Sequence, residues 1–275
     1  MPELPEVEHA ARTLGEQVVG ATFNGVVRCS WIRTIDSHPP EVIGARLADV
    51  SIVSWRRRAK WILLGLSSHD TFVAHLRMTG RFVVCHRDDA DIPQQRVAFG
   101  LHDGREIRFV DQRKFGRIFV MDPVELAALD GAHGPEPLDD TLTAHHRFER
   151  LQQTQRIIKP VLLDQSIIAG VGNIYADEAL WRSHIHPLTP AHCLSFDQVE
   201  LLLQSIRMVL RQALTNGGST LRDYRDSYGA KGTQQDNFQA YDRTGQPCYR
   251  CGAPIMKLVV AQRGTHICAV CQQLP

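Results

Sequence analysis

The chain has 275 residues, 43% of them hydrophobic, so it can bury a substantial core and does not have the composition of a disordered protein. No apolar run reaches the roughly 20 residues of a membrane-spanning helix, and the polar, acidic start Met1-Pro2-Glu3-Leu4 is unlike a secretion signal, so we expect a cytoplasmic protein. The 31 basic and 30 acidic side chains give a formal net charge of +1, which does not by itself favour a nucleic-acid partner.

The first predicted element is an amphipathic helix near the N-terminus. Apolar residues recur at helical spacing over residues 7–18, and Pro5 suits the first turn of a helix. Glu3 and Glu6 lie near its start, where the helix dipole favours negative charge. The pattern therefore predicts a helix with two carboxylates at its N-terminus.

Residues 21–121 have a different pattern, with short runs of β-branched and aromatic residues. Asp103-Gly104 separates two of these runs and is typical of a hairpin turn. We expect a β-sandwich or barrel of about eight strands here. Arg56, Arg57, Arg58 and Lys60 place four cations within five positions, a pattern found both on solvated faces and at nucleic-acid contacts.

A boundary between two regions is predicted at residues 131–138, where glycine and proline are frequent. Beyond it the pattern is helical. Ser195 and Gln198 form a capping-box pattern, and the apolar face that follows ends at Asn216-Gly217-Gly218. Residues 219–240 are polar and rich in glycine, and are predicted to be a mobile loop.

Four cysteines near the C-terminus have the spacing of a metal site. Cys248-x2-Cys251 and Cys268-x2-Cys271 are separated by 16 residues, which predicts one structural zinc ion with four thiolate ligands. Free thiols or two disulfides are the alternatives, and such a finger occurs in both DNA-binding and protein-binding modules. The remaining cysteines are scattered and are predicted to be core residues: Cys29, Cys85 and Cys193.

The opening residues Pro2-Glu3-Leu4-Pro5-Glu6 resemble the N-terminus of the formamidopyrimidine-DNA glycosylase family. The resemblance implies that Met1 is removed and that the nitrogen of Pro2 is the nucleophile. An α-amine has a pKa of about 7.7–8.0, so part of it is neutral at neutral pH, and a secondary amine can form an iminium. Glu3 and Glu6 are the candidate groups for proton transfer.

Further family motifs follow in the expected order along the chain. The resemblance assigns catalytic support to Lys60 and phosphate contact to Arg263, and identifies Asp164–Leu180 as a helix–two-turn–helix element. Without it, Met78 and Phe115 would be predicted as core residues. The DNA-binding residues that it implies, including a methionine wedge and an arginine–phenylalanine loop that fill the space of an extruded base, are His75, Met78, Arg113, Phe115, Lys159 and Asn173.

The resemblance implies an α+β fold with an N-terminal β-sandwich and a C-terminal helix–two-turn–helix domain bearing a four-cysteine zinc finger. It implies a monomeric, nucleoid-associated enzyme of base-excision repair that removes oxidised purines from double-stranded DNA through a Pro2 Schiff base and β,δ-elimination. The predicted segments are a catalytic domain at 1–130, a linker at 131–145, a DNA-binding domain with a lesion loop at 146–240 and the zinc finger at 241–275.

Two alternatives remain open at this point. An endonuclease VIII-like glycosylase for oxidised pyrimidines shares the fold and nucleophile, but typically has glycine at the position of Leu4. A non-catalytic DNA-binding relative would not need Pro2, Glu3 and Lys60. The chain also departs from the family at Gln94 and Gln155, where basic residues are common, and in the loop 229–238, which lacks an aromatic soon after its first glycine.

Overall fold

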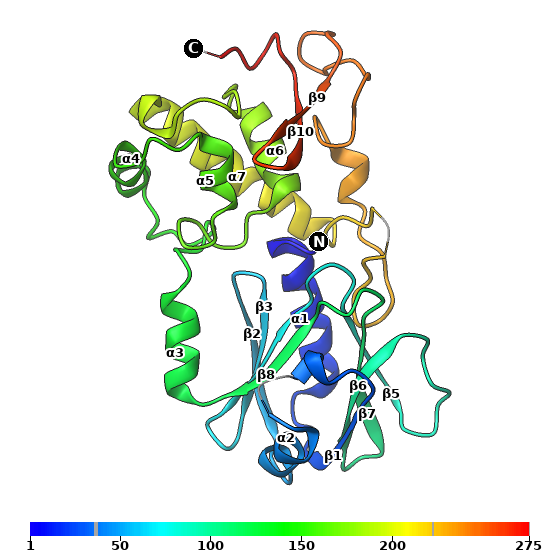
Figure 1. Ribbon diagram of the computed structural model, residues 1–275. Coiled ribbons are helices and arrows are strands. Elements are labelled where there is room, and N and C mark those ends of the chain that lie inside the picture. The colour runs from blue at the N-terminus through cyan, green and yellow to red at the C-terminus, as the bar shows by residue number, and fades with distance from the viewer. Residues whose placement is uncertain (36–37, 222, 275) are drawn as a thin grey trace. The chain divides into compact units, whose positions relative to one another are not determined.

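The computed structural model describes residues 1–35, 38–221 and 223–274, so Arg222 of the predicted mobile loop at 219–240 lies outside the described residues. Contacts within the chain define two compact units (Figure 1). The first contains Met1–Ala132 and Asn216–Thr233, and the second contains His133–Thr215 and Gln234–Pro275. The two units are described separately below.

The first unit is a β-sandwich with helices, as the sequence predicts. Its described strands form two four-stranded antiparallel sheets, in the orders β1-β6-β7-β5 and β2-β3-β4-β8. Phe23, Phe72 and Phe99 meet in the core, with Phe72 and Phe99 centroids 5.0 Å apart. The strands are β1 (Phe23–Cys29), β2 (Ile52–Arg58), β3 (Trp61–Leu66), β4 (Thr71–His75), β5 (Arg81–His86), β6 (Gln95–Leu101), β7 (Arg105–Val110) and β8 (Arg117–Met121).

The helix predicted at the N-terminus is confirmed as α1 (Leu4–Val18). Its apolar face is buried and packs against β2, β3 and β5 (Figure 1). Asp103-Gly104 does form the turn between β6 and β7. Two short helices that the sequence pattern does not predict, η1 (Ile32–Ile35) and α2 (Pro40–Leu47), lie between β1 and β2. Pro40 begins α2 because its fixed φ suits a first helical turn.

The loop at residues 216–233 belongs to the first unit, together with α3 (Pro123–Gly131). The sequence pattern places this loop in the predicted segment 146–240, because it follows the helical region along the chain. Its hydrogen bonds are formed with α1 instead, by residues more than 200 positions away. A local sequence pattern gives no information on hydrogen bonds between residues so far apart in the chain.

The second unit is helical and ends in a β-hairpin. Gly134, within the predicted linker, donates a backbone hydrogen bond to Gln165. The capping box is confirmed, since Ser195 N donates to Gln198 Oε1 (2.9 Å) and Gln198 N donates to Ser195 Oγ (3.2 Å). The elements are α4 (Ala144–Gln152), α5 (Ile158–Leu163), α6 (Asn173–Arg182), η2 (Ala191–Cys193), α7 (Phe196–Thr215), η3 (Gln234–Asn237), β9 (Met256–Val260) and β10 (Arg263–Ile267).

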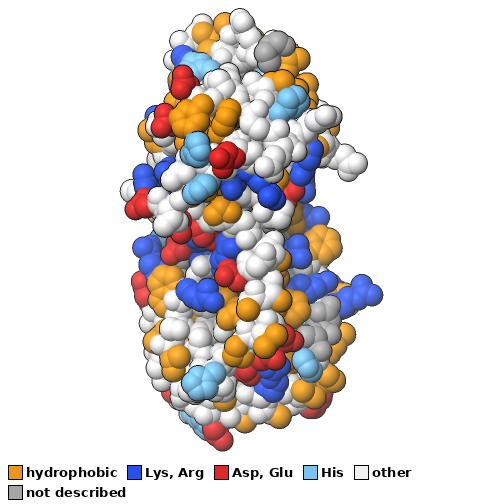
Figure 2. All heavy atoms as spheres, turned by 90° about the vertical axis from the view of Figure 1, so that its left-hand side faces the viewer, with side chains coloured by type: hydrophobic (Ala, Val, Ile, Leu, Met, Phe, Trp, Pro, Cys, Tyr) orange, Lys and Arg blue, Asp and Glu red, His pale blue; other side chains and the backbone are white. Residues whose placement is uncertain are grey.

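Neither unit contains, among its described residues, a helix of the length and hydrophobicity required to cross a membrane. On the face drawn in Figure 2, lysine and arginine side chains are interspersed with acidic and apolar ones. This distribution agrees with the formal net charge of +1.

Candidate functional site

The N-terminal turn of α1 brings Pro2 close to two buried carboxylates. Glu3 caps the helix, and its backbone N–H donates to Glu6 Oε2 (2.9 Å) in a reciprocal capping box. Both glutamate side chains are almost completely buried, and Pro2 is buried beside them. Because the Pro2 nitrogen is joined to Met1 by an amide bond, it becomes a nucleophilic amine only when Met1 is removed.

Glu6 also holds the loop at 216–233 against the start of α1. Its Oε1 accepts from the backbone N–H of Ser219 (2.7 Å) and from the Ser219 hydroxyl (3.0 Å). Gly218 has a φ of +79°, and a Cβ there would lie 2.9 Å from Glu6 Cγ, so only glycine allows this approach. Glu6 therefore links the residue after Pro2 to the loop.

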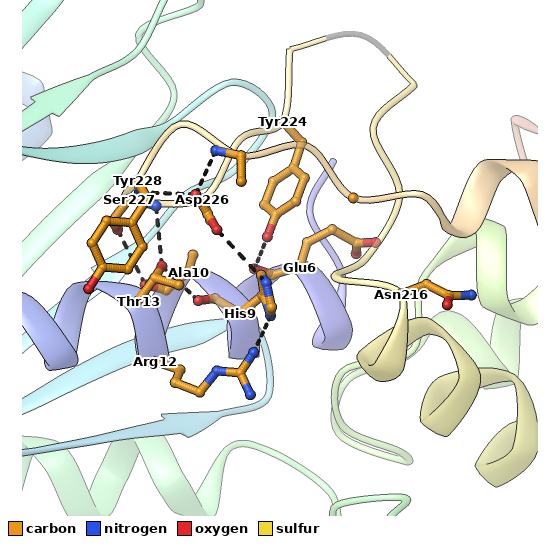
Figure 3. A network of polar contacts seen from close by, with 12 residues as sticks. Glu6, His9, Ala10, Arg12, Thr13, Asn216, Tyr224, Asp226, Ser227 and Tyr228 are labelled. Atoms are coloured by element: carbon orange, nitrogen blue, oxygen red, sulfur yellow. Dashed lines mark hydrogen bonds and ion pairs between the residues drawn. The ribbon is translucent and has the colours of Figure 1, made fainter.

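Three further contacts fix the loop along α1 (Figure 3). The Tyr224 hydroxyl donates to the Glu6 carbonyl (3.0 Å), Asp226 Oδ2 lies 3.8 Å from His9 Nε2, and Ser227 N donates to Thr13 Oγ1 (3.2 Å). Burial, followed by the charges of Glu6 and Asp226, raises the pKa of Tyr224. Its hydroxyl therefore remains a hydrogen-bond donor throughout the neutral range.

Lys60 lies in the turn of the β2–β3 hairpin, against which α1 packs. Its side chain is buried, and Ala59 before it has a φ of +51°. In the preceding basic run, Arg57 Nε donates to Glu8 Oε2 on α1 (2.9 Å) and Arg58 pairs with Asp130. Part of the basic run is thus used in ion pairs inside the unit.

The predicted wedge residues lie on two turns of the β-sandwich. Met78 and Phe115 are 38% and 48% exposed, so neither is the core residue that its type alone predicts. The guanidinium carbon of Arg113 lies 5.0 Å from the centroid of the Phe115 ring. His75 is buried at the end of β4 and accepts from Arg77 N (3.0 Å), so it supports the turn that presents Met78.

Lys159 and Asn173, both predicted DNA contacts, are bound to the zinc-finger hairpin in the second unit. Lys159 is fully buried, and its Nζ donates to Asp177 Oδ1 (2.5 Å) and Thr265 Oγ1 (2.7 Å). Asn173 Nδ2 donates to the Gly264 carbonyl (2.9 Å). Both residues thus position the segment beside Arg263, whose side chain is exposed.

The four finger cysteines form the site that their spacing predicts. Their sulfur atoms all lie within 4.8 Å of one another, and sulfurs around tetrahedral zinc are about 3.8 Å apart. Burial opposes ionisation of Cys248, but backbone hydrogen bonds and the Trp181 indole lower its pKa to about 6. Burial and the neighbouring thiols raise the pKa of Cys271 to about 12. Four thiolates therefore need a cation here, and the residues fit one structural zinc ion.

Helix α6 supplies supporting residues that the sequence analysis missed. Asp177 accepts from Lys159 and from His266 N (2.8 Å). Glu178 accepts the backbone N–H groups of residues 239–241, and burial raises its pKa. The available signal was two adjacent acidic residues within the otherwise apolar stretch 174–181, a combination that indicates buried, paired carboxylates.

Comparison with protein families gives three matches along the chain. The formamidopyrimidine-DNA glycosylase N-terminal domain matches residues 1–118, the formamidopyrimidine-DNA glycosylase H2TH domain matches 133–225, and the zinc finger found in FPG and IleRS matches 245–274. The three matches follow the order of the motifs in the sequence.

Individual relatives match over their whole length. The formamidopyrimidine-DNA glycosylase of Roseiflexus sp. (strain RS-1) is 55% identical over 99% of this chain and 100% of its own. The Lactococcus lactis Fpg in complex with abasic-site DNA has a TM-score of 0.91 and 33% identity, covering 98% of this chain and 99% of that one. The same enzyme with FAPY-dG DNA gives 0.91 and 33%, covering 98% and 100%. The chain belongs to the formamidopyrimidine-DNA glycosylase family.

Proposed function

We propose that this protein excises oxidised purines, such as 8-oxoguanine and formamidopyrimidines, from duplex DNA and then cleaves the strand at the abasic site. The observation that carries the proposal is the buried Glu3–Glu6 capping box next to Pro2, in a chain of the glycosylase family. It places the Pro2 nitrogen, a secondary amine once Met1 is removed, close to the carboxylates of Glu3 and Glu6, which can transfer protons.

In the proposed reaction the neutral Pro2 nitrogen, exposed by removal of Met1, attacks C1′ of the damaged nucleoside. The bond from C1′ to the base breaks, and the base leaves with the proton that the Pro2 nitrogen loses on forming its bond to C1′. Glu3 protonates the ring oxygen of the sugar, which opens to an iminium between C1′ and Pro2. Lys60 stabilises negative charge on the lesion strand.

The iminium then acts as an electron sink for strand cleavage. Loss of a C2′ proton expels the 3′ phosphate, and a second elimination expels the 5′ phosphate. Water releases the sugar fragment and restores the amine. Arg263, on the exposed start of β10, is proposed to bind a DNA phosphate, and the zinc ion to maintain the hairpin that carries it.

The wedge residues are proposed to stabilise the extruded state of the lesion. Extruding a base costs a few kcal/mol. Met78 and Phe115 present apolar surface to solvent, and Arg113 lies beside the phenyl ring. These groups would fill the vacated space and contact the unpaired base.

Borohydride trapping tests the chemistry on duplexes that carry 8-oxoguanine, thymine glycol or an abasic site. We expect an adduct with 8-oxoguanine that peptide mass spectrometry locates at the nitrogen of Pro2 in a chain lacking Met1. Retention of Met1, or an adduct on another residue, contradicts the proline mechanism. An adduct only with thymine glycol indicates an oxidised-pyrimidine glycosylase, and no adduct at all indicates a non-catalytic relative.

The role of the finger has a separate test. Removal of zinc should weaken duplex binding by at least about 10-fold, or ~1.4 kcal/mol, because Arg263 loses its support. Unchanged affinity of verified metal-free protein contradicts this role. The monomeric state and the cytoplasmic, nucleoid-associated location are proposed from the family resemblance. Light scattering of the full chain tests whether it is a monomer.

A further inference from the structure

We propose that Thr79 and Asp111 are positioning residues that lock the Met78 turn and the Arg113–Phe115 loop into one wedge for base extrusion. The inference rests on the proposed function, because it assigns Thr79 and Asp111 a role in the extrusion of the damaged base. Both side chains belong to the first unit, and neither has a role in the chemistry proposed above.

Asp111 lies at the centre of the two turns. Its side chain is fully buried immediately after β7, and its Oδ2 accepts from the backbone N–H of Gly116 (2.7 Å). Its Oδ1 accepts from the backbone N–H of Arg113 (3.1 Å). One carboxylate therefore fixes both ends of the loop that presents Phe115.

Thr79 connects this loop to the turn that carries Met78. Its hydroxyl donates to Asp111 Oδ1 (2.5 Å) and accepts from Arg113 N (3.0 Å). A methionine wedge and an arginine–phenylalanine pair, more than 30 positions apart in the sequence, thus share a single hydrogen-bonded centre.

The centre is itself fixed to the β-sandwich. Arg96 Nε donates to the Asp111 carbonyl (2.8 Å), and Asp111 N donates to the Gln94 carbonyl (3.1 Å). A Cβ at Gly116 would lie 2.4 Å from Phe109 Cζ, so the loop packs on the core as closely as glycine permits. The wedge side chains are exposed while their backbone is held rigidly.

This arrangement has an energetic consequence for extrusion. An apolar side chain that fills a vacated base position stabilises the extruded state only if it is already directed there, because ordering a loop during the reaction costs conformational entropy. Two turns held by one buried carboxylate avoid that cost. Loss of the link should therefore slow extrusion more than the later steps.

Thr79→Val tests the link because valine preserves the shape of threonine and removes its hydroxyl. We expect excision of 8-oxoguanine under single-turnover conditions to slow by about 3- to 10-fold, and cleavage at a preformed abasic site, which needs no base extrusion, to change by less than about 2-fold. Thr79→Ser should restore excision. The matched control is Thr22→Val, which removes a hydroxyl pair with Ser51 (2.8 Å) elsewhere in the unit and should leave both rates unchanged.

A double-mutant cycle separates positioning from simple destabilisation. If Thr79 acts through the wedge, Thr79→Val should add less than about 2-fold to the defect of Met78→Ala/Phe115→Ala, since nothing remains to be positioned. Fully multiplicative effects, equal losses on both substrates, or a Thr79→Val protein indistinguishable from Thr22→Val would overturn the inference.

Extrusion can also be measured without excision, from the fluorescence of a 2-aminopurine placed next to the lesion. If the wild-type protein gives a fluorescence change that Thr79→Val slows, but forms no borohydride adduct, the proposed chemistry is refuted and the wedge is supported. Adduct formation with a signal unaffected by Thr79→Val would refute the wedge and support the chemistry. If neither an adduct nor a fluorescence change is observed, the proposed chemistry and the wedge are both refuted.

Discussion

The two units hold their candidate functional residues in different ways. In the second unit, α6 and the zinc finger form a buried network in which Asp177 binds Lys159 and His266, and four cysteines enclose the metal site. In the first unit, Pro2 lies at a helix end and the wedge residues lie on turns, and single carboxylates hold the backbone beside them by accepting its N–H hydrogen bonds.

This difference separates binding from chemistry in physical terms. A finger that presents Arg263 needs rigidity, which a metal and a buried ion pair supply. In the first unit the exposed wedge side chains are held by the buried Asp111, and the loop at 216–233 is held by the buried Glu6. Variants of each unit should therefore fail in different assays.

The largest effect is expected in the first unit, for Glu3→Gln. Glutamine retains the size of the side chain but cannot donate the proton that opens the sugar, so single-turnover excision should fall by about 10²- to 10⁴-fold. Glu16→Gln is the matched control, an exposed glutamate on the same helix, and should leave the rate unchanged. An active Glu3→Gln enzyme would remove Glu3 from the mechanism.

The second largest effect is expected in the second unit, for Lys159→Met. It leaves Asp177 buried without its cation, and the free energy of unfolding should fall by about 3–5 kcal/mol. Arg156→Met breaks an exposed ion pair with Asp164 (2.8 Å) and should cost about 0–1 kcal/mol.

Zinc release during urea unfolding follows the second unit specifically. The urea concentration at which half of the zinc is released should be lower for Lys159→Met than for the wild type, and unchanged for Arg156→Met. Equal midpoints would show that the buried pair does not stabilise the finger, and that the contrast between the units is weaker than the structure indicates.

The sequence predicts features that depend on local spacing. Helical periodicity predicts α1 and α7, short runs of β-branched and aromatic residues predict the β-sandwich, and cysteine spacing predicts the four metal ligands. Each of these signals operates over a few residues, because a helix, a strand or a metal knuckle is determined by its own backbone geometry.

The supporting contacts could not be predicted because they join distant segments. Glu6 and Ser219 are 213 positions apart, and Lys159 and Thr265 are 106 apart. Lys159 illustrates the limit: the family resemblance implies a DNA contact for this residue, and no local signal predicts that tertiary packing buries its side chain against Asp177. Exposure of Met78 and Phe115 was likewise predictable only from the family resemblance.

Tyr224→Phe tests how tightly the loop at 216–233 is held in the first unit. It removes the hydrogen bond to the Glu6 carbonyl, worth about 0.5–1.5 kcal/mol. Amide hydrogen exchange at residues 223–228 should accelerate by about 2- to 12-fold. Tyr228→Phe, at a side chain that is 61% exposed, is the control. Equal exchange in the two variants would mean that the Tyr224 hydroxyl does not hold the loop.

The smallest effect concerns pH and His9, which faces Asp226 of the same loop. Burial and then Arg12 lower the pKa of His9, while Asp226, Glu16 and Glu8 oppose this shift. Because the folded state binds the proton less readily than the unfolded state, the stability of the first unit should decline as the pH falls below the ordinary histidine value of about 6.5.

His9→Gln should flatten this dependence, with a change smaller than that of Tyr224→Phe because the histidine is only partly buried. Unfolding measured at about pH 7.5 and about pH 5.5 gives the comparison. If wild type and His9→Gln lose the same stability on acidification, or if wild type becomes more stable, His9 does not couple the loop to pH. The loop would then depend on its other contacts with α1, which are those of Ser219 with the Glu6 side chain, of Tyr224 with the Glu6 carbonyl and of Ser227 with Thr13.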